Sequence, residues 1–249
     1  MPILEAERSY FYRTVSPNRD KMKVGIIIAM SSEYNEMLKL LGGKAEGEIA
    51  GNRIILRESG IGKVNAAVKA VEMIKQEQPD CIISTGVAGG AGKGVRIMDI
   101  VVGREIVYHD VWCGDGNEYG QVQGLPARFK SDDTLYNIAM SLKGNGGTAM
   151  DRISSIHGGL ICSGDYFVGP EQLEAIRKRF PEGLAVEMES GALAQVCHIY
   201  GIPFLSFRVI SDSPEEEGNY SQYIDFWSTV AETSFKNIRC FLEALPKSL

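Results

Sequence analysis

The stretch that decides the fold is Phe204-Leu205-Ser206-Phe207-Arg208-Val209-Ile210-Ser211-Asp212-Ser213, an apolar run that ends at a hydroxyl and a carboxylate. Residues 204–210 are mostly apolar and β-prone, which predicts a buried strand of a parallel sheet. Such sheets bind their ligands just beyond the carboxyl ends of the strands. Asp212 is therefore predicted to lie where a ligand would bind, although an aspartate before Pro214 is equally well explained as a turn residue.

Two further carboxylates follow predicted strands of the same sheet. Glu33 comes after the apolar run 24–30, and Glu189 ends the segment Val186-Glu187-Met188-Glu189, which follows the strand-like residues 183–185. Taken singly, each is explained as a carboxylate in the first turn of a helix. Because ligands bind where parallel strands end, the three carboxylates together predict a single pocket.

The composition is typical of a globular chain and excludes several classes of partner. The 249 residues are 44% hydrophobic and 23% charged, which is enough to bury the core of one α/β domain. The net charge of −6 and the lack of a lysine or arginine block argue against nucleic acid as a partner. No apolar run approaches the ~20 residues of a membrane helix, so we expect no membrane association. A small polar substrate is compatible with this composition.

Cysteine and histidine usage favours a reducing compartment and no metal. The five cysteines are odd in number and show no C-x-x-C spacing, which indicates reduced thiols in the cytoplasm. None of the three histidines forms an H-E-x-x-H motif. Cys197 and His198 are sequence neighbours that a helix would point about 100° apart, so packing explains them better than a metal site does.

The chain is predicted to fold as an N-terminal extension, residues 1–21, followed by one domain, residues 22–249. The extension mixes charges with aromatic residues and has no apolar core of a signal peptide. Beyond it, predicted strands alternate with helices, which indicates a three-layer α/β/α sandwich around a mixed, mostly parallel sheet. The predicted strands are 24–30, a hairpin within 47–58, 81–85, 97–102, 105–108, 159–162, 183–185 and 204–210; the helices are 33–41, 64–76, 132–142, 170–179, 189–200 and 221–242.

Glycine-rich segments follow two of these strands, at 59–63 and 86–92. Neither matches a Walker A loop or G-x-G-x-x-G, so we expect only that their backbone amides approach a ligand closely. Phe167 follows the strand 159–162. Core packing is its commoner explanation, but at a sheet edge its ring could stack on a purine.

Seven motifs occur in the order found in bacterial methylthioadenosine/S-adenosylhomocysteine nucleosidases, and the chain resembles this family of the nucleoside phosphorylase superfamily over residues 22–245. They are Gly25-Ile26-Ile27-Ile28-Ala29-Met30 with Glu33, Ser59-Gly60-Ile61-Gly62-Lys63, Thr85-Gly86-Val87-Ala88-Gly89-Gly90, Tyr108-His109-Asp110, Ser163-Gly164-Asp165, Val186-Glu187-Met188-Glu189 and Arg208-Val209-Ile210-Ser211-Asp212.

The resemblance implies a homodimer that hydrolyses an adenine N-glycosidic bond without metal or organic cofactor. It implies that Asp212 is the general acid, positioned by Ser211, and that Glu33 activates water. Glu189 and Met188 would hold the ribose hydroxyls, Arg208 would order Glu189, Phe167 would stack on adenine, and the Val168 backbone would read the edge of the base. The same resemblance adds to the substrate-binding set Glu187, Ile61, Val87, Met30, Ala88 and Gly89.

Three segments depart from the family pattern. Val87 stands where members often carry serine. Residues 111–123, which in the family cover the 5′ substituent across the dimer, are more polar than usual here. Residues 215–217 are three glutamates beside Asp212.

Three other functions are weighed against the hydrolase. A purine nucleoside phosphorylase needs cationic groups around phosphate, but the segment 29–33 has none and carries Glu33, which would repel the anion. A nucleosidase for an aminodeoxyfutalosine-type substrate would share the same core and differ only at the tail. A catalytically silent binding protein would not need both an acid and a base.

Overall fold

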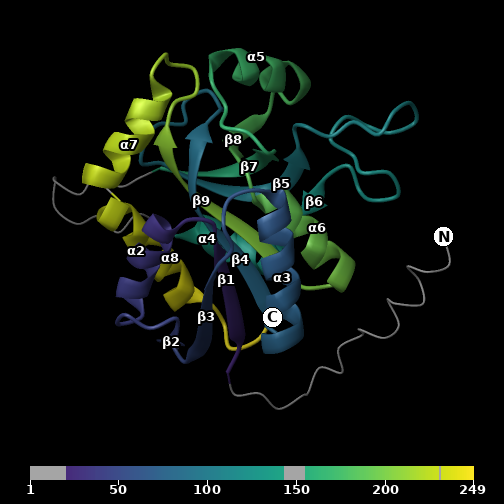
Figure 1. The fold of residues 1–249 in the computed structure, drawn as a ribbon. Helices are drawn as coiled ribbons and strands as arrows, with labels where there is room; N and C mark the ends of the chain where they lie inside the picture. Colours follow the sequence, from purple (N-terminus) through teal and green to yellow (C-terminus); the bar gives the residue numbers. More distant parts are fainter. Residues whose placement is uncertain (1–20, 143–154, 230) are drawn as a thin grey trace.

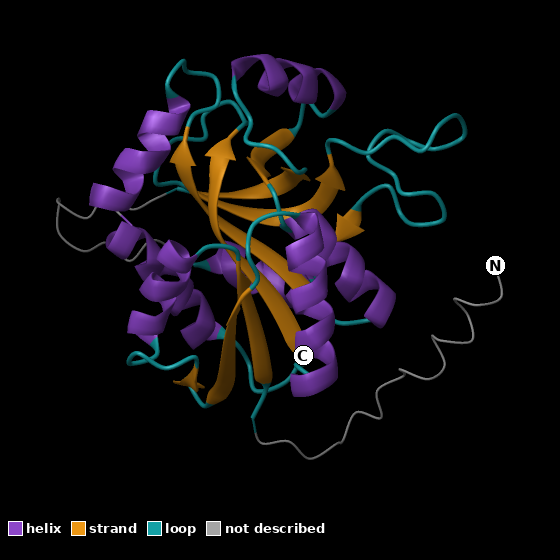
Figure 2. Cartoon of the chain, viewed as in Figure 1, coloured by secondary structure: helices purple, strands orange, loops and turns teal. Residues whose placement is uncertain are grey.

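The quoted stretch forms strand β9 (Phe204–Asp212), and all nine of its residues are buried. It lies inside a mixed sheet with helices on both faces (Figures 1 and 2). The computed structural model describes residues 21–142, 155–229 and 231–249. Most of the predicted extension, residues 1–21, therefore lies outside the described residues.

Strand β9 joins two parts of the sheet because it pairs with β4 in parallel and with β5 antiparallel. The other strands form a continuous path, and β9 closes the middle of it into a ring with β4, β8, β7 and β5. In path order the strands are β2 (Glu46–Ile49), β3 (Asn52–Glu58), β1 (Lys23–Ile28), β4 (Cys81–Gly90), β8 (Gly183–Glu187), β7 (Ile156–Ser163), β5 (Ile100–Tyr108) and β6 (Phe129–Lys130).

Helices cover the two faces of the sheet through separate apolar clusters. On one face α2 (Ser31–Leu40), α4 (Asp133–Ser141) and α8 (Ala231–Ala244) pack Met37, Leu135 and Phe241 against the strands. On the other face α3 (Lys63–Glu77) and α6 (Ser190–Tyr200) contribute the second cluster. Helices α5 (Pro170–Arg179) and α7 (Asn219–Thr229) lie at the end of the molecule to which the carboxyl ends of β4 and β9 point (Figure 1).

The predicted mixed sheet with helices on both sides is confirmed, but three local predictions are wrong. The strand predicted to stop at Thr85 continues through the glycines to Gly90, because β8 and β9 both pair with that segment. The predicted strands 97–102 and 105–108 are one strand, β5, with an irregular register between Gly103 and Glu105. The helix predicted over 221–242 is divided into α7 and α8. No helix among the described residues is long and apolar enough to span a membrane.

Candidate active site

The site is organised around Arg208, a guanidinium on β9 that is only 1% exposed. Its Nη2 lies 2.7 Å from Glu187 Oε2, and its Nη1 lies 4.0 Å from Glu189 Oε2. Nη2 also donates to the hydroxyls of Ser84 (2.6 Å) and Ser190 (3.0 Å). A buried charge is tolerated only when it is paired and hydrogen-bonded, and these contacts meet both conditions.

Glu33 enters the same region from the first turn of α2. Its Oε1 accepts a hydrogen bond from Val87 N at 2.8 Å, and its Oε2 accepts one from Met30 N at 3.2 Å. Gly86 permits this approach, because a Cβ there would lie 2.5 Å from Glu33 Oε1 and 2.9 Å from Arg208 Nη1. The φ of +146° at Gly86 is also one that few other residues adopt.

Burial of several acids beside one arginine sets the electrostatics of the site. Burial raises the pKa of Glu33 above its ordinary value, although Arg208 and the amides of Val87 and Met30 oppose the shift. Burial, followed by the charge of Glu187, likewise raises the pKa of Glu189. These two carboxyl groups therefore hold protons at higher pH than exposed glutamates do.

Glu187 and Glu189 have different partners although they are two residues apart. The Glu187 carboxylate accepts hydrogen bonds from the backbone N–H groups of Glu189 (3.0 Å) and Ser190 (2.8 Å), at the N-terminus of α6. Glu189 instead accepts from Gly62 N at 2.9 Å, which brings the first glycine segment to the site. Arg208 therefore contacts Glu187 more closely than Glu189, the residue that the sequence led us to expect as its partner.

Asp212 ends β9 and is 3% exposed. Ser211 Oγ donates to Asp212 Oδ1 at 2.7 Å, and Asn219 Nδ2 donates to Asp212 Oδ2 at 3.0 Å. The same Asn219 nitrogen donates to Val168 O at 3.0 Å. Burial raises the pKa of Asp212, while the bonds from Ser211 and Asn219 act in the opposite direction.

The register of β4 relates Asp212 to Glu33. Glu33 binds the amide of Val87, and Asp212 pairs with Gly89 two residues further along the same strand. The register of β4 with β9 shifts between Ala88 and Gly89, so the two contacts lie on either side of this irregularity. Between them lies Ala88, whose carbonyl is 3.4 Å from Ser211 Oγ.

Phe167 is exposed at the site rather than buried in the core. Its ring is 45% exposed and lies edge-on to Tyr220 and Tyr223 of α7, with centroids 5.7 and 5.9 Å away. The Tyr223 hydroxyl contacts Met30 Sδ at 3.0 Å. Burial raises the pKa of Tyr223, and the charges of Glu33 and Asp212 act in the same direction. Tyr223 of α7 therefore lies near Met30, Phe167 and the two buried carboxyl groups.

A hollow of about 260 Å³ opens beside Glu189. It is lined by Ile61, Gly62, Lys63, Val64, Asn65, Asp165 and Met188. None of its lining residues comes from 111–123, so that segment does not cover the hollow within one chain. Trp112 of the segment instead stacks on Tyr119, over which Arg179 also lies.

The predicted site residues thus gather at one edge of the sheet, and the structure adds others that the sequence did not single out. Asn219 follows three glutamates and a glycine, and its neighbours suggested only a loop. Tyr223 and the buried hydroxyls of Ser84 and Ser190 also carried no local signal. Glu215 of the acidic loop pairs with Arg177 on the surface. No cluster of metal-ligating side chains occurs within the described ranges.

Comparisons with known proteins identify the relatives of this chain. Residues 23–243 match the family model of the phosphorylase superfamily. A 5′-methylthioadenosine/S-adenosylhomocysteine nucleosidase of Actinobacillus succinogenes is 37% identical over 236 residues, covering 90% of this chain and all of the relative. The Neisseria meningitidis enzyme of that name, solved with methylthio-immucillin-A, is 39% identical with a TM-score of 0.82, covering 90% of this chain and 100% of the other. The Colwellia psychrerythraea enzyme, solved with adenine, is 33% identical with a TM-score of 0.82, covering 92% and 98%.

Proposed function

The chain belongs to the phosphorylase superfamily and, within it, to the 5′-methylthioadenosine/S-adenosylhomocysteine nucleosidases, and from this we propose that it hydrolyses the adenine N-glycosidic bond of those two nucleosides. The products are adenine and the corresponding thioribose. The observation that carries the proposal is the pair of buried carboxyl groups beside one stretch of β4, where Glu33 accepts from Val87 N and Asp212 pairs with Gly89.

Asp212 acts as the general acid. Cleavage of the glycosidic bond leaves its electron pair on the purine, and a proton delivered to a ring nitrogen makes the purine a better leaving group. The donor must therefore be protonated near neutral pH, and burial raises the pKa of Asp212 in that direction. Ser211 holds one oxygen of the carboxyl group in place.

Glu33 acts as the general base that takes a proton from the attacking water. Its raised pKa brings it closer to the working pH of a base, and two backbone N–H groups fix its carboxyl group. The transition state resembles an oxocarbenium ion, with the leaving base on one face of the sugar and water on the other. Because water attacks the face of the sugar opposite the leaving purine, inversion at the anomeric carbon follows.

The remaining site residues hold the nucleoside. Glu189 and Met188 bind the ribose hydroxyls, and Arg208 with Glu187 fixes the start of α6 from which Glu189 extends. Phe167 stacks on adenine, while the backbone of Val168 reads the edge of the base. The same pocket is also lined by the side chain or backbone of six further residues: Met30, Ile61, Val87, Ala88, Gly89 and Ser211.

Hydrolysis is favoured over phosphorolysis by the position of Glu33. A carboxyl group, rather than a cation, occupies the turn after β1 and lies beneath Gly86. A phosphate ion there would meet a negative or neutral oxygen instead of a positive partner. The aminodeoxyfutalosine-type substrate differs at the tail, and the test below includes it.

The experiment is adenine release from methylthioadenosine with and without inorganic phosphate. We expect equal rates and the free thioribose as product. Formation of the sugar 1-phosphate would identify a phosphorylase instead. Binding of methylthioadenosine without adenine release would identify a silent binding protein, and exclusive cleavage of the aminodeoxyfutalosine-type nucleoside would identify the related hydrolase.

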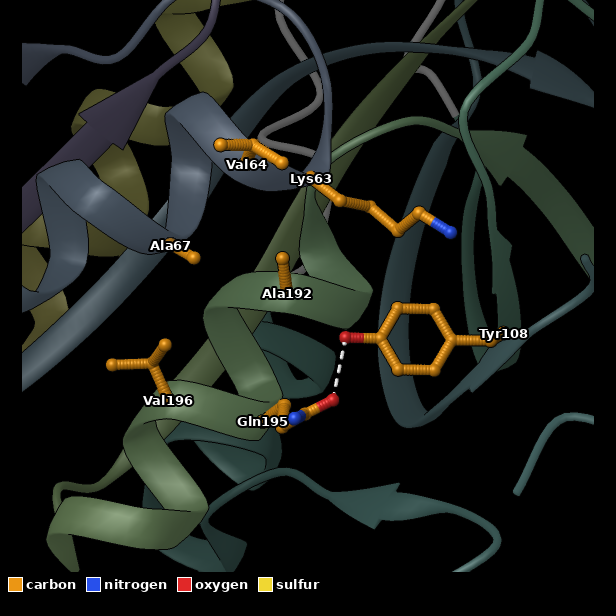
Figure 3. A pocket seen from close by; sticks show the side chains of 7 residues that line it. All are labelled: Lys63, Val64, Ala67, Tyr108, Ala192, Gln195 and Val196. Carbon is orange, nitrogen blue, oxygen red and sulfur yellow. Dashed lines mark hydrogen bonds between the residues drawn. The ribbon is translucent and has the colours of Figure 1, made fainter. Parts of the chain in front are cut away.

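We also propose that two copies associate through the face formed by α3 and α6. Val64 and Val68 of α3 are 73% and 53% exposed, although both are apolar. Beside them lies a hollow of about 180 Å³ (Figure 3), where Tyr108 donates a hydrogen bond to Gln195 at 2.9 Å. An apolar face of this kind is typical of a protein–protein contact. In such a dimer the 111–123 segment of one copy would be free to cover the 5′ substituent in the other.

We also propose the bounds of the domain and the compartment in which the protein works. Residues 22–249 form the nucleosidase domain, in agreement with the family match over 23–243. None of the five cysteines, all of which lie in the described residues, is joined in a disulfide, and this agrees with a reducing compartment such as the cytoplasm.

A further inference from the structure

Asn219 joins two groups that the proposed reaction uses separately. It is the first residue of α7 and is 6% exposed. Its Nδ2 donates to Asp212 Oδ2, on the carboxyl end of β9, and to Val168 O, in the loop between β7 and α5, both at 3.0 Å. A carboxamide nitrogen carries two N–H groups, so a single atom satisfies both acceptors at once.

We propose that Asn219 is a positioning residue of the reaction. It holds the carboxyl group of Asp212, the general acid, and the backbone carbonyl of Val168, which lies at the edge of the adenine, in fixed positions relative to each other. This inference rests on the proposed function. It gives the first residue of α7 a role in positioning Asp212 and Val168, in addition to the contact of this helix with Phe167.

The orientation of the Asp212 carboxyl group follows from two donors. Ser211 Oγ occupies a lone pair of Oδ1, and Asn219 Nδ2 occupies a lone pair of Oδ2. Because both oxygens accept a hydrogen bond, the plane of the carboxyl group cannot rotate freely. The lone pair that remains on each oxygen is available to the proton that is transferred. Loss of Asn219 would leave the group held at one oxygen only.

The same contact adjusts the strength of the acid. A donor facing a carboxyl group stabilises its ionised form, so Asn219 favours release of the proton, while burial favours its retention. When the proton passes to the purine and the glycosidic electron pair moves onto the base, Asn219 is already placed to stabilise the resulting carboxylate. The other groups that face Asp212 are Ser211 on β9 and Tyr223 on α7.

Asn219 also attaches helix α7 to the site. Two aromatic residues further along α7, Tyr220 and Tyr223, lie edge-on to Phe167. Asn219 attaches the first turn of this helix to Val168, the residue after Phe167. This hydrogen bond and the ring contacts therefore fix the position of the helix relative to the Phe167 ring.

The test compares Asn219→Ala and Asn219→Asp with wild type and with a matched control, Gln222→Ala. Gln222 also attaches the start of α7, by accepting from Ser213 N at 2.8 Å, but it contacts neither Asp212 nor Val168. Each protein is assayed for adenine release from methylthioadenosine across pH, and for binding of free adenine by titration calorimetry. Thermal melting identifies a variant that has lost its fold, in which case the isosteric Asn219→Asp carries the comparison.

We expect Asn219→Ala to lower kcat/KM by about tenfold to a hundredfold, mostly through kcat, because a hydrogen bond to a charged group is lost. Adenine should bind several-fold more weakly. The alkaline limb of the pH profile, where Asp212 must stay protonated, should move upward by about half to one unit, because the donor that favoured ionisation is gone. Asn219→Asp should shift this limb upward too, since a second carboxyl group opposes ionisation of the first. Gln222→Ala should leave the limb in place.

An unchanged alkaline limb in both Asn219 variants would overturn the inference. Tighter adenine binding by Asn219→Ala would also overturn it, because Asn219 would then occupy the position of the base instead of supporting it. If wild type releases no adenine, the proposed function itself has failed, and that result is seen before any variant is made.

Discussion

Replacement of Asp212 by asparagine tests the acid directly, because the surroundings can accept an amide. One carboxyl oxygen faces Asn219 Nδ2 at 3.0 Å, and the oxygen of the new amide can keep that bond. The other faces the Ser211 hydroxyl at 2.7 Å, which can rotate to accept from the new NH₂ group and donate toward Ala88 O. Both contacts therefore survive in exchanged form.

The expected loss lies in the chemical step rather than in folding or binding. Because the Asp212 carboxyl group is protonated in the resting enzyme, the substitution replaces one neutral group by another, which changes the stability by about 1 kcal/mol or less. Removal of a general acid lowers kcat by about 10²- to 10⁴-fold, equivalent to about 3 to 5 kcal/mol in the transition state.

The assay combines adenine release at saturating methylthioadenosine with calorimetric titration of the same nucleoside into the variant. We expect kcat to fall within that range while the dissociation constant changes by less than about tenfold. Asp99→Asn is the matched control: Asp99 is another buried aspartate, at the amino end of β5, where it binds Ser155 N and His157. It should lose stability but keep its turnover. A kcat for Asp212→Asn within tenfold of wild type would refute the assignment of the acid.

Four further outcomes are expected. Arg208→Met leaves the carboxylate of Glu187 buried without its cation and should destabilise the protein by about 3 to 5 kcal/mol in chemical denaturation, whereas Arg239→Ala, at the exposed pair with Glu243, should cost less than about 1 kcal/mol. Because the pKa of Glu33 is raised on folding, its contribution to stability is present at low pH and is lost as the pH rises above about 4.5 through the folded value. Melting curves of Glu33→Gln should accordingly depend less on pH in that window, and an equal dependence would contradict the shift. S-adenosylhomocysteine should be cleaved with a kcat/KM within about tenfold of that for methylthioadenosine, and side-by-side kinetics showing a hundredfold preference would contradict it. Val64→Glu should convert dimers to monomers in light scattering, and an unchanged mass would place the contact elsewhere.

Much of the site was predictable because the family's motifs are short and local. The strand 204–210 and the acid at its end required only an apolar run followed by a polar stop, and the structure places both as expected. Glu33, Glu189 and Phe167 were placed by the same argument, each following a predicted strand. The family resemblance was confirmed by the comparisons over nearly the whole chain.

The failed prediction that the strand stops at Thr85 has a physical cause. Glycines at 86–90 suggested a turn because glycine weakens an isolated strand. In the structure residues 86–89 pair with β9, Gly89 and Gly90 also pair with β8, and Gly86 is required there by the close approach of Glu33 and Arg208. Propensity describes an unpartnered segment, whereas pairing with neighbours decides the outcome in the folded chain.

By itself, then, the sequence determined the elements and the carboxylates at their ends, because apolar periodicity and polar stops act over a few residues. Only the tertiary structure decided that β9 closes the sheet between β4 and β5, that Arg208 pairs with Glu187 more closely than with Glu189, and that Asn219 reaches both Asp212 and Val168. Each of these depends on atoms that are distant in sequence and meet at distances of a few ångströms. Side-chain hydrogen bonds depend on that approach and its angles, which no local pattern of residue types encodes.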